Sequence, residues 1–198
     1  RPDSAADALW VVDLCQRRGI PVRSVRLAIA DGGHSAIEER ARQARYAVLE
    51  TMARDWGATA ILTGHTADDH AETILHHLFR GTGLRGLTGI PAVRSLDDCL
   101  WLWRPLLAAR RPEILDELQR LRQIFRIDDS NNSPVFTRNR IRNELIPWVE
   151  RELNPQAVDV ILRLSEQATE VQEWMREEAK HLLTRSLVSF TPRHVRLR

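Results

Sequence analysis

The sequence predicts an α/β protein, with a parallel sheet covered by helices and a helical segment at the C-terminal end. Residues 59–63 form a short apolar run that is suited to a buried parallel strand. Residues 22–30 are rich in β-formers and partly alternating. Helical signals surround both runs, and strands that alternate with helices at this spacing indicate βαβ units.

The first two helices carry start signals in the sequence. Residues 4–18 are expected to be helical because Ser4 and Asp7 have the spacing of a capping box. The same spacing recurs at Ser35 and Glu38, ahead of a second helix. Together with the strand candidates, these helices make up the α/β body.

The amino-acid composition of the chain changes after the third expected helix, which covers residues 68–80. Residues 81–91 contain four glycines and a proline, a composition too flexible for a helix interior. A strand pair is expected within 91–106. Helices are then expected from Pro112 and behind Asn154, which precedes Pro155 as an N-cap.

In the helix behind Asn154, apolar residues recur at multiples of three or four and favour packing against a partner helix; they are Val158, Ile161, Ala168, Val171 and Met175. We therefore expect two domains, residues 1–108 and a helical segment over 109–198.

Composition excludes several classes of protein. The chain has 198 residues, a net charge of +2 and 43% hydrophobic residues, which is ordinary for a globular protein. No run approaches the roughly 20 apolar residues of a membrane helix. Cys15 and Cys99 form no CxxC motif, so a disulfide framework or a cysteine metal site is not expected. Lys180 is the only lysine, and arginine is the better group for bidentate phosphate contacts.

Titratable residues are most concentrated in the stretch TGHTADDHAETILHHLFRGTG, residues 63–83. Its start follows the carboxyl end of the strand over 59–63, where open sheets bind ligands. On a helix over 68–80, Asp69 and Glu72 are neighbours on one exposed face. The opposite arc is apolar and is expected to face the sheet; it contains Ala71, Ile74, Leu75 and Leu78. Two carboxylates on one face predict a receptor for a cation, either an ammonium group or a metal ion.

Two other interpretations of this stretch remain open. Thr66 and Asp69 have the spacing of a capping box, and acids in a first helical turn also offset the helix dipole. Alternatively, His65, Asp69 and His70 could ligate a metal. No second cluster of comparable density completes such a site, so no metal centre is predicted.

Several motifs, in order, resemble the tRNA(Ile)-lysidine synthetase family of N-type ATP pyrophosphatases, or PP-loop enzymes. They are ARQARYAVL at 41–49, GHTADDHAET at 64–73, LFRGTGLRGLTGIP at 78–91, WRPLL at 103–107 and DDSNNSPVFTRNRIRNELIP at 128–147. The resemblance extends over residues 1–168. The sequence is therefore identified as a member of this family, with a partial PP-loop domain over 1–108.

The resemblance implies that ATP, with Mg²⁺, adenylates the wobble cytidine of the isoleucine tRNA with a CAU anticodon. Free L-lysine then attacks the activated carbon and gives lysidine, AMP and pyrophosphate. A cytoplasmic location, no membrane partner and a possible homodimer are also expected.

The resemblance assigns roles to four groups of residues. The catalytic residues would be Arg45, Asp69 and Glu72. Lysine would bind to Asp69 and Glu72, and ATP to Arg45, Gly64, His65 and Arg1. Arg42, one turn before Arg45, is a weaker candidate for phosphate contact. The tRNA would contact Arg85, Arg138, Arg140 and Arg142, and for the last three the alternative is ion pairs with Asp128, Asp129 and Glu144.

The sequence also departs from the family. The phosphate-cradling SGGxDS loop does not occur in it, and we expect that loop to precede Arg1, so this segment alone is expected to be inactive. Thr66 stands where the family commonly has histidine, and His70 where it commonly has glutamine. Neither change removes Asp69 or Glu72.

Three other functions compete with lysine ligation. A 2-thiocytidine type of PP-loop enzyme needs cysteines for sulfur chemistry, which Cys15 and Cys99 do not supply. A non-catalytic RNA-binding module does not need the outward-facing acids. A metal-dependent hydrolase would bind stoichiometric zinc or manganese, and metal analysis separates it from a ligase.

Overall fold

The computed structural model describes residues 4–27, 34–126, 137–191 and 194–197. The chain forms two compact units that are interleaved in sequence. Unit 1 comprises Arg1–Thr63, Val93–Arg104 and Asp116–Asn131, and unit 2 comprises Gly64–Ala92, Pro105–Leu115 and Asn132–Arg198.

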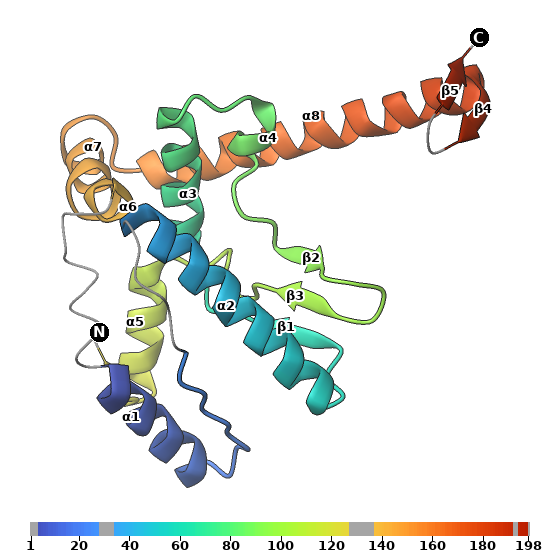
Figure 1. The fold of residues 1–198 in the computed structure, drawn as a ribbon. Helices are drawn as coiled ribbons and strands as arrows, with labels where there is room; N and C mark the ends of the chain where they lie inside the picture. The colour runs from blue at the N-terminus through green and yellow to red at the C-terminus, as the bar shows by residue number, and fades with distance from the viewer. Residues whose placement is uncertain (1–3, 28–33, 127–136, 192–193, 198) are drawn as a thin grey trace. The chain divides into compact units, whose positions relative to one another are not determined.

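Unit 1 contains a small mixed sheet with the strand order β1-β3-β2 (Figure 1). Strand β1 (Ala60–Leu62) runs parallel to β3 (Trp101–Trp103), and β2 (Val93–Ser95) is antiparallel to β3. The strand over 59–63 and the strand pair within 91–106 are thereby confirmed. The α/β class is confirmed as well, although the sheet is mixed rather than purely parallel.

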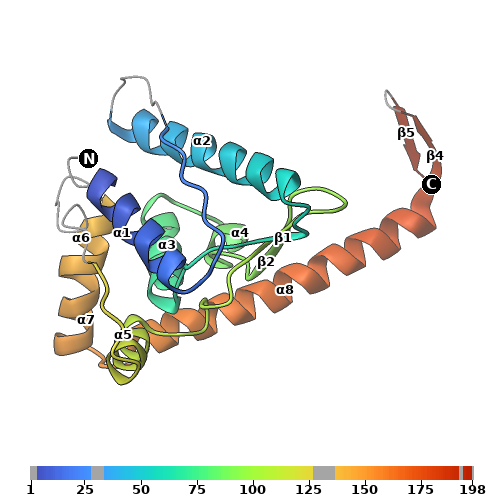
Figure 2. The same ribbon diagram turned by 90° about the horizontal axis from the view of Figure 1, so that it is seen from below.

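The core of unit 1 joins helix α2 (His34–Asp55) to the sheet, and α2 runs alongside β1 in both ribbon views (Figures 1 and 2). Its buried members come from α2, β1 and the approach to β3: Ala53, Ile61, Leu100 and Leu102, with Tyr46, Leu49 and Leu96 packed against them. Helix α1 (Ser4–Arg17) confirms the first expected helix. Two hydrogen bonds join α1 and its C-terminal end to the segment after α5, from Arg126 to Asp7 at 2.5 Å and from Arg18 to Gln123 at 2.5 Å.

The strand expected over 22–30 is wrong where the structure describes it. Residues 21–27 have no strand conformation, and residues 28–30 lie outside the described ranges. The side chains of residues 23–26 are exposed. Arg23 and Arg26 would place one arginine on each face of a strand, no apolar face is buried here, and burial is what drives strand pairing.

Unit 2 is built around helix α3 (Ala67–Phe79), which packs against the N-terminal half of α8 (Ala157–Ser186). The buried core joins Ala71 to Ile141, Ile146 and Val158. Leu75 also packs against this cluster. The apolar arc of α3 was expected to face the sheet, whereas the partners given for Ala71 and Leu75 are helices of unit 2.

A π-helical turn interrupts the helix that supplies three of the predicted arginines, Arg138, Arg140 and Arg142. The segment begins as α6 (Thr137–Arg140), widens into the π turn η2 (Ile141–Leu145) and continues as α7 (Ile146–Glu152). The amide of Ile146 donates to the carbonyl of Ile141, five residues earlier. Pro147 comes next and has no amide to donate, which disfavours regular α-helical bonding at this point.

Helix α8 begins at Ala157, two residues after the predicted start at Pro155, and the side chain of Asn154 accepts a hydrogen bond from the amide of Gln156 at 2.9 Å, as expected of a cap. Val158 and Ala168 are buried, but Val171 and Met175 are exposed, so only the first half of α8 packs as expected. A hairpin of β4 (Leu187–Thr191) and β5 (His194–Leu197) follows, which the helical interpretation did not include.

Two shorter helices complete the description. Helix α5 (Arg111–Arg120) confirms the helix expected from Pro112, and α4 (Leu84–Leu87) adds one helical turn to the glycine-rich segment. Within the described ranges, no helix is long and apolar enough to cross a membrane.

Truncating a buried side chain of the central strand should destabilise the fold. Leu102 is fully buried in β3, so Leu102→Ala should lower the free energy of unfolding by about 2–5 kcal/mol. Leu62 in β1 is 62% exposed, so Leu62→Ala is the matched control and should change stability by less than about 1 kcal/mol. Urea titration followed by circular dichroism measures both, and equal effects would contradict the placement of Leu102 in the core.

Candidate functional site

The N-terminus of α3 is fixed by a capping box between Thr66 and Asp69. The backbone amide of Thr66 donates to Asp69 Oδ2 at 2.9 Å, and the amide of Asp69 donates to Thr66 Oγ1 at 3.3 Å. The capping interpretation of this stretch is therefore confirmed. It leaves Asp69 Oδ1 available for other partners.

Glu72, one turn further along α3, is only 1% exposed. The expectation that it lies on an exposed face is wrong. A helical wheel treats the surface opposite an apolar arc as solvent, but here the polar face of α3 is covered by arginine side chains from other segments of unit 2.

Arg142, in the π turn, is the main partner of both acids. Its Nε and Nη2 donate to Glu72 Oε1 at 2.6 Å and Oε2 at 2.8 Å, a bidentate pair, and Nη2 also reaches Asp69 Oδ1 at 2.9 Å. Arg138 adds a bond from Nε to Glu72 Oε2 at 3.2 Å and one to the carbonyl of Asp69 at 3.2 Å. Bidentate guanidinium–carboxylate pairs combine strength with a fixed geometry.

A third arginine approaches from the start of α5. Arg111 Nη2 lies 3.6 Å from Asp69 Oδ1 and 3.9 Å from Glu72 Oε1. Beside it, Asp68 accepts from Arg110 Nε at 3.0 Å and from the Arg111 amide at 2.5 Å. We call Asp69, Glu72, Arg111, Arg138 and Arg142 the carboxylate–arginine cluster.

The cluster carries both signs of charge, since two carboxylates face three guanidinium groups and one positive charge is in excess. Burial raises the pKa of the Asp69 carboxyl, but hydrogen bonds from Thr66 and the charges of Arg138 and Arg142 outweigh it, so the pKa lies below its usual value. Asp69 therefore stays ionised at neutral pH.

The opposite shift applies to Arg142. Its hydrogen bond to Glu72 is the largest influence and raises the pKa of the guanidinium against the effect of burial. Asp69 and Arg142 are thus held in their charged forms. A mixed cluster of this kind can bind a ligand that carries both an ammonium group and a carboxylate.

Arg45 lies in unit 1, on an exposed part of α2. It makes no ion pair or hydrogen bond with any described residue. One turn earlier, the guanidinium of Arg42 lies 5.8 Å from the centre of the Tyr46 ring. Arg104, from the WRPLL motif, is 5% exposed. Burial lowers the pKa of Arg104, its hydrogen bond to Tyr46 raises it, and the charges of Arg94 and Arg42 lower it further.

The other predicted residues lie in different surroundings. Gly64 is exposed and His65 half-buried, both immediately before α3, while Arg1 lies outside the described ranges. Arg140 is exposed and pairs with Glu144 at 3.6 Å, one of the ion pairs considered from the sequence. Arg85 is exposed on α4.

His70 connects three segments of unit 2. Its Nε2 lies 3.2 Å from the carbonyl of Thr88 and 3.0 Å from the hydroxyl of Ser165, which is buried in α8. Burial lowers the pKa of this imidazole, and the Thr88 carbonyl and the charge of Glu166 offset that only in part. Among the described residues, no group of three or more histidines, cysteines and acids is arranged to hold a metal ion.

Sequence reasoning missed Arg110 and Arg111 as partners of the acids, and it did not connect Arg138 and Arg142 with Asp69 and Glu72. One available signal was that Arg138 and Arg142 are four residues apart, on one helical face. No signal at the level of single residues marked the Arg110–Arg111 pair.

Acidification should weaken the packing around His70. The folded protein holds the neutral imidazole, whereas an unfolded histidine takes up a proton below about pH 6.5, so stability should fall as the pH drops from 7.5 to 5.5. His70→Gln keeps a donor for the Thr88 carbonyl but does not titrate. Unfolding titrations across this range should therefore give a flatter pH profile for the variant, and parallel profiles would contradict the assignment.

Neutralising Glu72 should be costly. Glu72→Gln removes the negative charge that Arg138 and Arg142 pair with, at a position that is almost fully buried. It should lower the free energy of unfolding by about 3 kcal/mol. Adding Arg142→Met should recover part of that loss, with a coupling energy of about 1–3 kcal/mol in a double-mutant cycle. Additive losses would show that the pair is not coupled.

Comparison with family models gives one match over most of the chain, the PP-loop domain, which covers residues 1–149. All of β1, α3 and the carboxylate–arginine cluster falls within this range.

Among known proteins, the chain is similar to proteins named tRNA(Ile)-lysidine synthase. It is 44% identical to that of Novosphingobium aromaticivorans over 145 residues, covering 72% of this chain and 44% of the relative. It is 36% identical to that of Rhodopirellula baltica, covering 96% and 47%, and 38% identical to that of Salinispora tropica, covering 96% and 60%. The chain thus spans about half the length of these relatives.

A solved structure with a similar fold is the U34-tRNA thiolase NcsA from Methanococcus maripaludis. The TM-score is 0.62 at 15% sequence identity, over 84% of this chain and 58% of that one. With the α/β architecture and the family match over residues 1–149, this chain belongs to the PP-loop family.

Proposed function

We propose that this chain is part of a tRNA(Ile)-lysidine synthase, a ligase that uses ATP to join lysine to the wobble cytidine of the CAU-anticodon isoleucine tRNA. The observation that carries the proposal is the pair of carboxylates, Asp69 and Glu72, held in a cluster of mixed charge. The similarity to proteins of that name over 91–98% of the chain in several relatives supports it.

Lysine is a suitable ligand for such a cluster because it carries charges of both signs. An ammonium group can bind to Asp69 and Glu72, while the carboxylate can bind to the excess guanidinium charge of Arg111 or Arg138. Both carboxylate oxygens of Glu72 already accept hydrogen bonds from Arg142, so Asp69 is the acid better able to accept a new partner. The low pKa of Asp69 suits an anchor for a cation rather than a proton acceptor.

ATP supplies the adenylyl group that activates the cytidine, with Mg²⁺ as its companion ion. Arg45 is proposed to contact the α-phosphate and to stabilise the charge that develops during adenylyl transfer. Arg45 is exposed and makes no hydrogen bond or ion pair with described residues that would have to be broken first. Gly64 and His65 are proposed as further nucleotide contacts, and Arg1 remains a prediction from the resemblance.

The tRNA is proposed to contact Arg85 and Arg140, which are exposed, and its contact with Arg140 is proposed to involve a phosphate. Arg138 and Arg142 direct their guanidinium groups to Asp69 and Glu72, so their proposed contact with tRNA would require them to serve two partners. The cytoplasmic location and the homodimer remain predictions.

A 2-thiocytidine type of enzyme is the second candidate, since one solved structure with a similar fold is a tRNA thiolase. Cys15 and Cys99 form no CxxC pair for sulfur chemistry, which does not favour it. Labelled sulfur and labelled lysine, offered in parallel to the same tRNA, distinguish the two reactions.

The test of lysine ligation is incorporation of labelled lysine into CAU-anticodon isoleucine tRNA by the complete gene product with ATP. Asp69→Asn keeps an acceptor oxygen for Thr66 but removes the charge, and it should raise the KM for lysine by about tenfold to a hundredfold. Glu173 is exposed on α8, so Glu173→Gln is the matched control and should leave KM unchanged.

The same assay separates the role of Arg45 from that of Asp69. Arg45→Ala should reduce the rate of pyrophosphate release by about a hundredfold with little change in the KM for lysine. An unaltered KM for lysine in Asp69→Asn, or normal pyrophosphate release in Arg45→Ala, would refute the corresponding role.

A further inference from the structure

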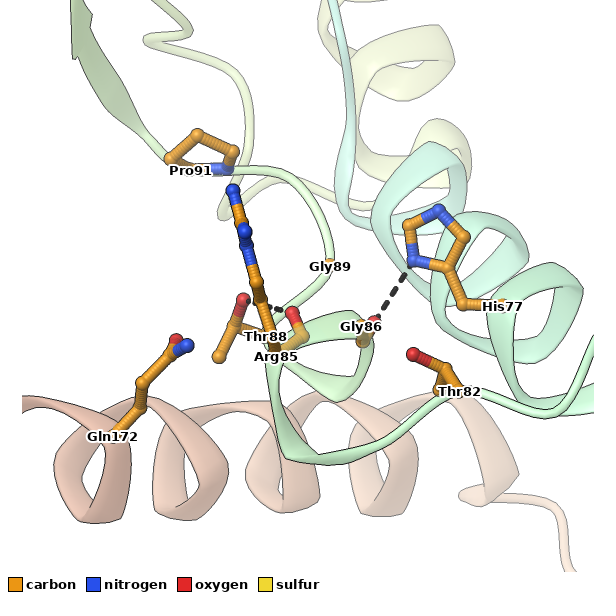
Figure 3. A pocket seen from close by; sticks show the side chains of 8 residues that line it. All are labelled: His77, Thr82, Arg85, Gly86, Thr88, Gly89, Pro91 and Gln172. Carbon is orange, nitrogen blue, oxygen red and sulfur yellow. Dashed lines mark hydrogen bonds between the residues drawn. The ribbon is translucent and has the colours of Figure 1, made fainter. Parts of the chain in front are cut away.

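Unit 2 contains a cavity of about 500 Å³ beside α4 and α8 (Figure 3). This volume lies within the range of small-ligand pockets. Its walls come from the C-terminal part of α3, the glycine-rich segment and the middle of α8. The carboxylate–arginine cluster contributes no residue to its lining, so the cavity is a separate feature of the unit.

Close contacts fix the shape of this cavity. His77 Nδ1 lies 2.9 Å from the carbonyl of Gly86, and the hydroxyl of Thr88 donates to the carbonyl of Arg85 at 2.9 Å. Gly89 has a φ of +62°, and a Cβ there would lie 2.3 Å from the ring of His70. The glycine-rich segment is therefore pinned to α3, and the cavity is a preformed site.

Two polar side chains in the cavity are available for a ligand. The Arg85 side chain extends toward Pro91, and the amide of Gln172 points from α8 toward the same space (Figure 3). Neither side chain makes an ion pair or hydrogen bond with any described residue. No described acidic residue lines the cavity, so an electron-rich ligand meets no repulsion.

These groups match an unstacked nucleobase. A guanidinium plane is a platform on which a splayed base of single-stranded RNA stacks, and a glutamine amide pairs with the N6 and N7 edge of adenine through one donor and one acceptor. A phosphate alone would bind to the guanidinium of Arg85, but it would not pair with both the donor and the acceptor of the Gln172 amide.

The distance along α3 indicates which base this is. His77 follows Asp69 by eight residues, which corresponds to about 12 Å along a helix. A base in the cavity is therefore too far from Asp69 to be the one that receives lysine there. A neighbour of the reacting cytidine is required, and in the CAU anticodon the neighbour is adenine.

We propose that this cavity receives the central adenine of the CAU anticodon, stacked on Arg85 and paired with Gln172. The proposal rests on the proposed function, because that function supplies the tRNA. It assigns to Gln172, on α8, a role in reading the anticodon.

The experiment uses the complete gene product and 17-nucleotide anticodon hairpins labelled with fluorescein. One hairpin carries adenine at the central anticodon position and the other carries purine, which lacks the N6 amino group. Fluorescence anisotropy should show about tenfold tighter binding of the adenine hairpin by the wild-type protein. Gln172→Leu should remove this preference, and Arg85→Ala should weaken binding of both hairpins by about tenfold.

Two exposed residues of α8 outside the cavity supply matched controls. Gln167→Leu should keep the preference for adenine, and Arg176→Ala should bind both hairpins like the wild type. Thermal melting by circular dichroism establishes that each variant is folded. The inference is overturned if Gln172→Leu keeps the preference, if Arg85→Ala and Arg176→Ala weaken binding equally, or if the wild type shows no preference.

Lysine incorporation, measured in parallel, separates this inference from the proposed function. Hairpin binding requires no turnover, so a preference that depends on Gln172 in a protein that incorporates no lysine would refute the ligase and retain the adenine site. Lysine incorporation that is unchanged in Gln172→Leu and Arg85→Ala, with unchanged hairpin binding, would retain the ligase and refute the adenine site.

Discussion

A carboxylate that is almost fully buried must meet positive charge within hydrogen-bond reach, and Glu72 meets it in Arg142 at 2.6 and 2.8 Å. This pair joins α3 to the π turn, two segments 70 residues apart in sequence. Ala71, the residue before Glu72, is buried against Ile141, the residue before Arg142. The polar contact and the apolar contact thus stabilise the same junction, and the remaining arginines of the cluster are arranged around it.

The geometry of the cluster also limits what it can bind. A simple pair of acids would attract any cation, including a metal ion. Three guanidinium groups around Asp69 and Glu72 raise the electrostatic cost of binding a divalent ion and leave an amino acid as the better-matched ligand. In the proposed function, the preference for a ligand that carries both charges would come from the arginines as much as from the acids.

Elements that are dictated by local interactions could be predicted from the sequence. The capping spacing of Thr66 and Asp69, the apolar run around Ile61 and the cap at Asn154 all depend on residues close in the chain. The strand expected over 22–30 did not form in its described part, because β-propensity acts only where a sheet edge and a buried face are available. The small mixed sheet follows from the antiparallel β2, which pairs across a tight connection to β3.

The candidate site was predictable in composition but not in arrangement. The motifs identified Asp69, Glu72, Arg138 and Arg142 individually, yet their mutual pairing depends on contacts across 66–73 residues of sequence. Helical periodicity describes one helix against solvent, so it placed Glu72 outside. Only the tertiary structure shows that the polar face of α3 at Glu72 is buried.

The π turn at Ile141–Leu145 has a consequence for how this sequence can vary in length. A turn of this kind holds one residue more than the regular helix would need between the same two ends. Removing that residue would restore ordinary bonding but rotate everything after it by about 100°. Ile146 would then leave the apolar contact with Val158, while Arg138 would keep its position. The π turn thus allows one continuous helix to present Arg138 and Arg142 to α3 and Ile146 to the core with Val158 of α8. We therefore expect the spacing across it to tolerate no single-residue deletion.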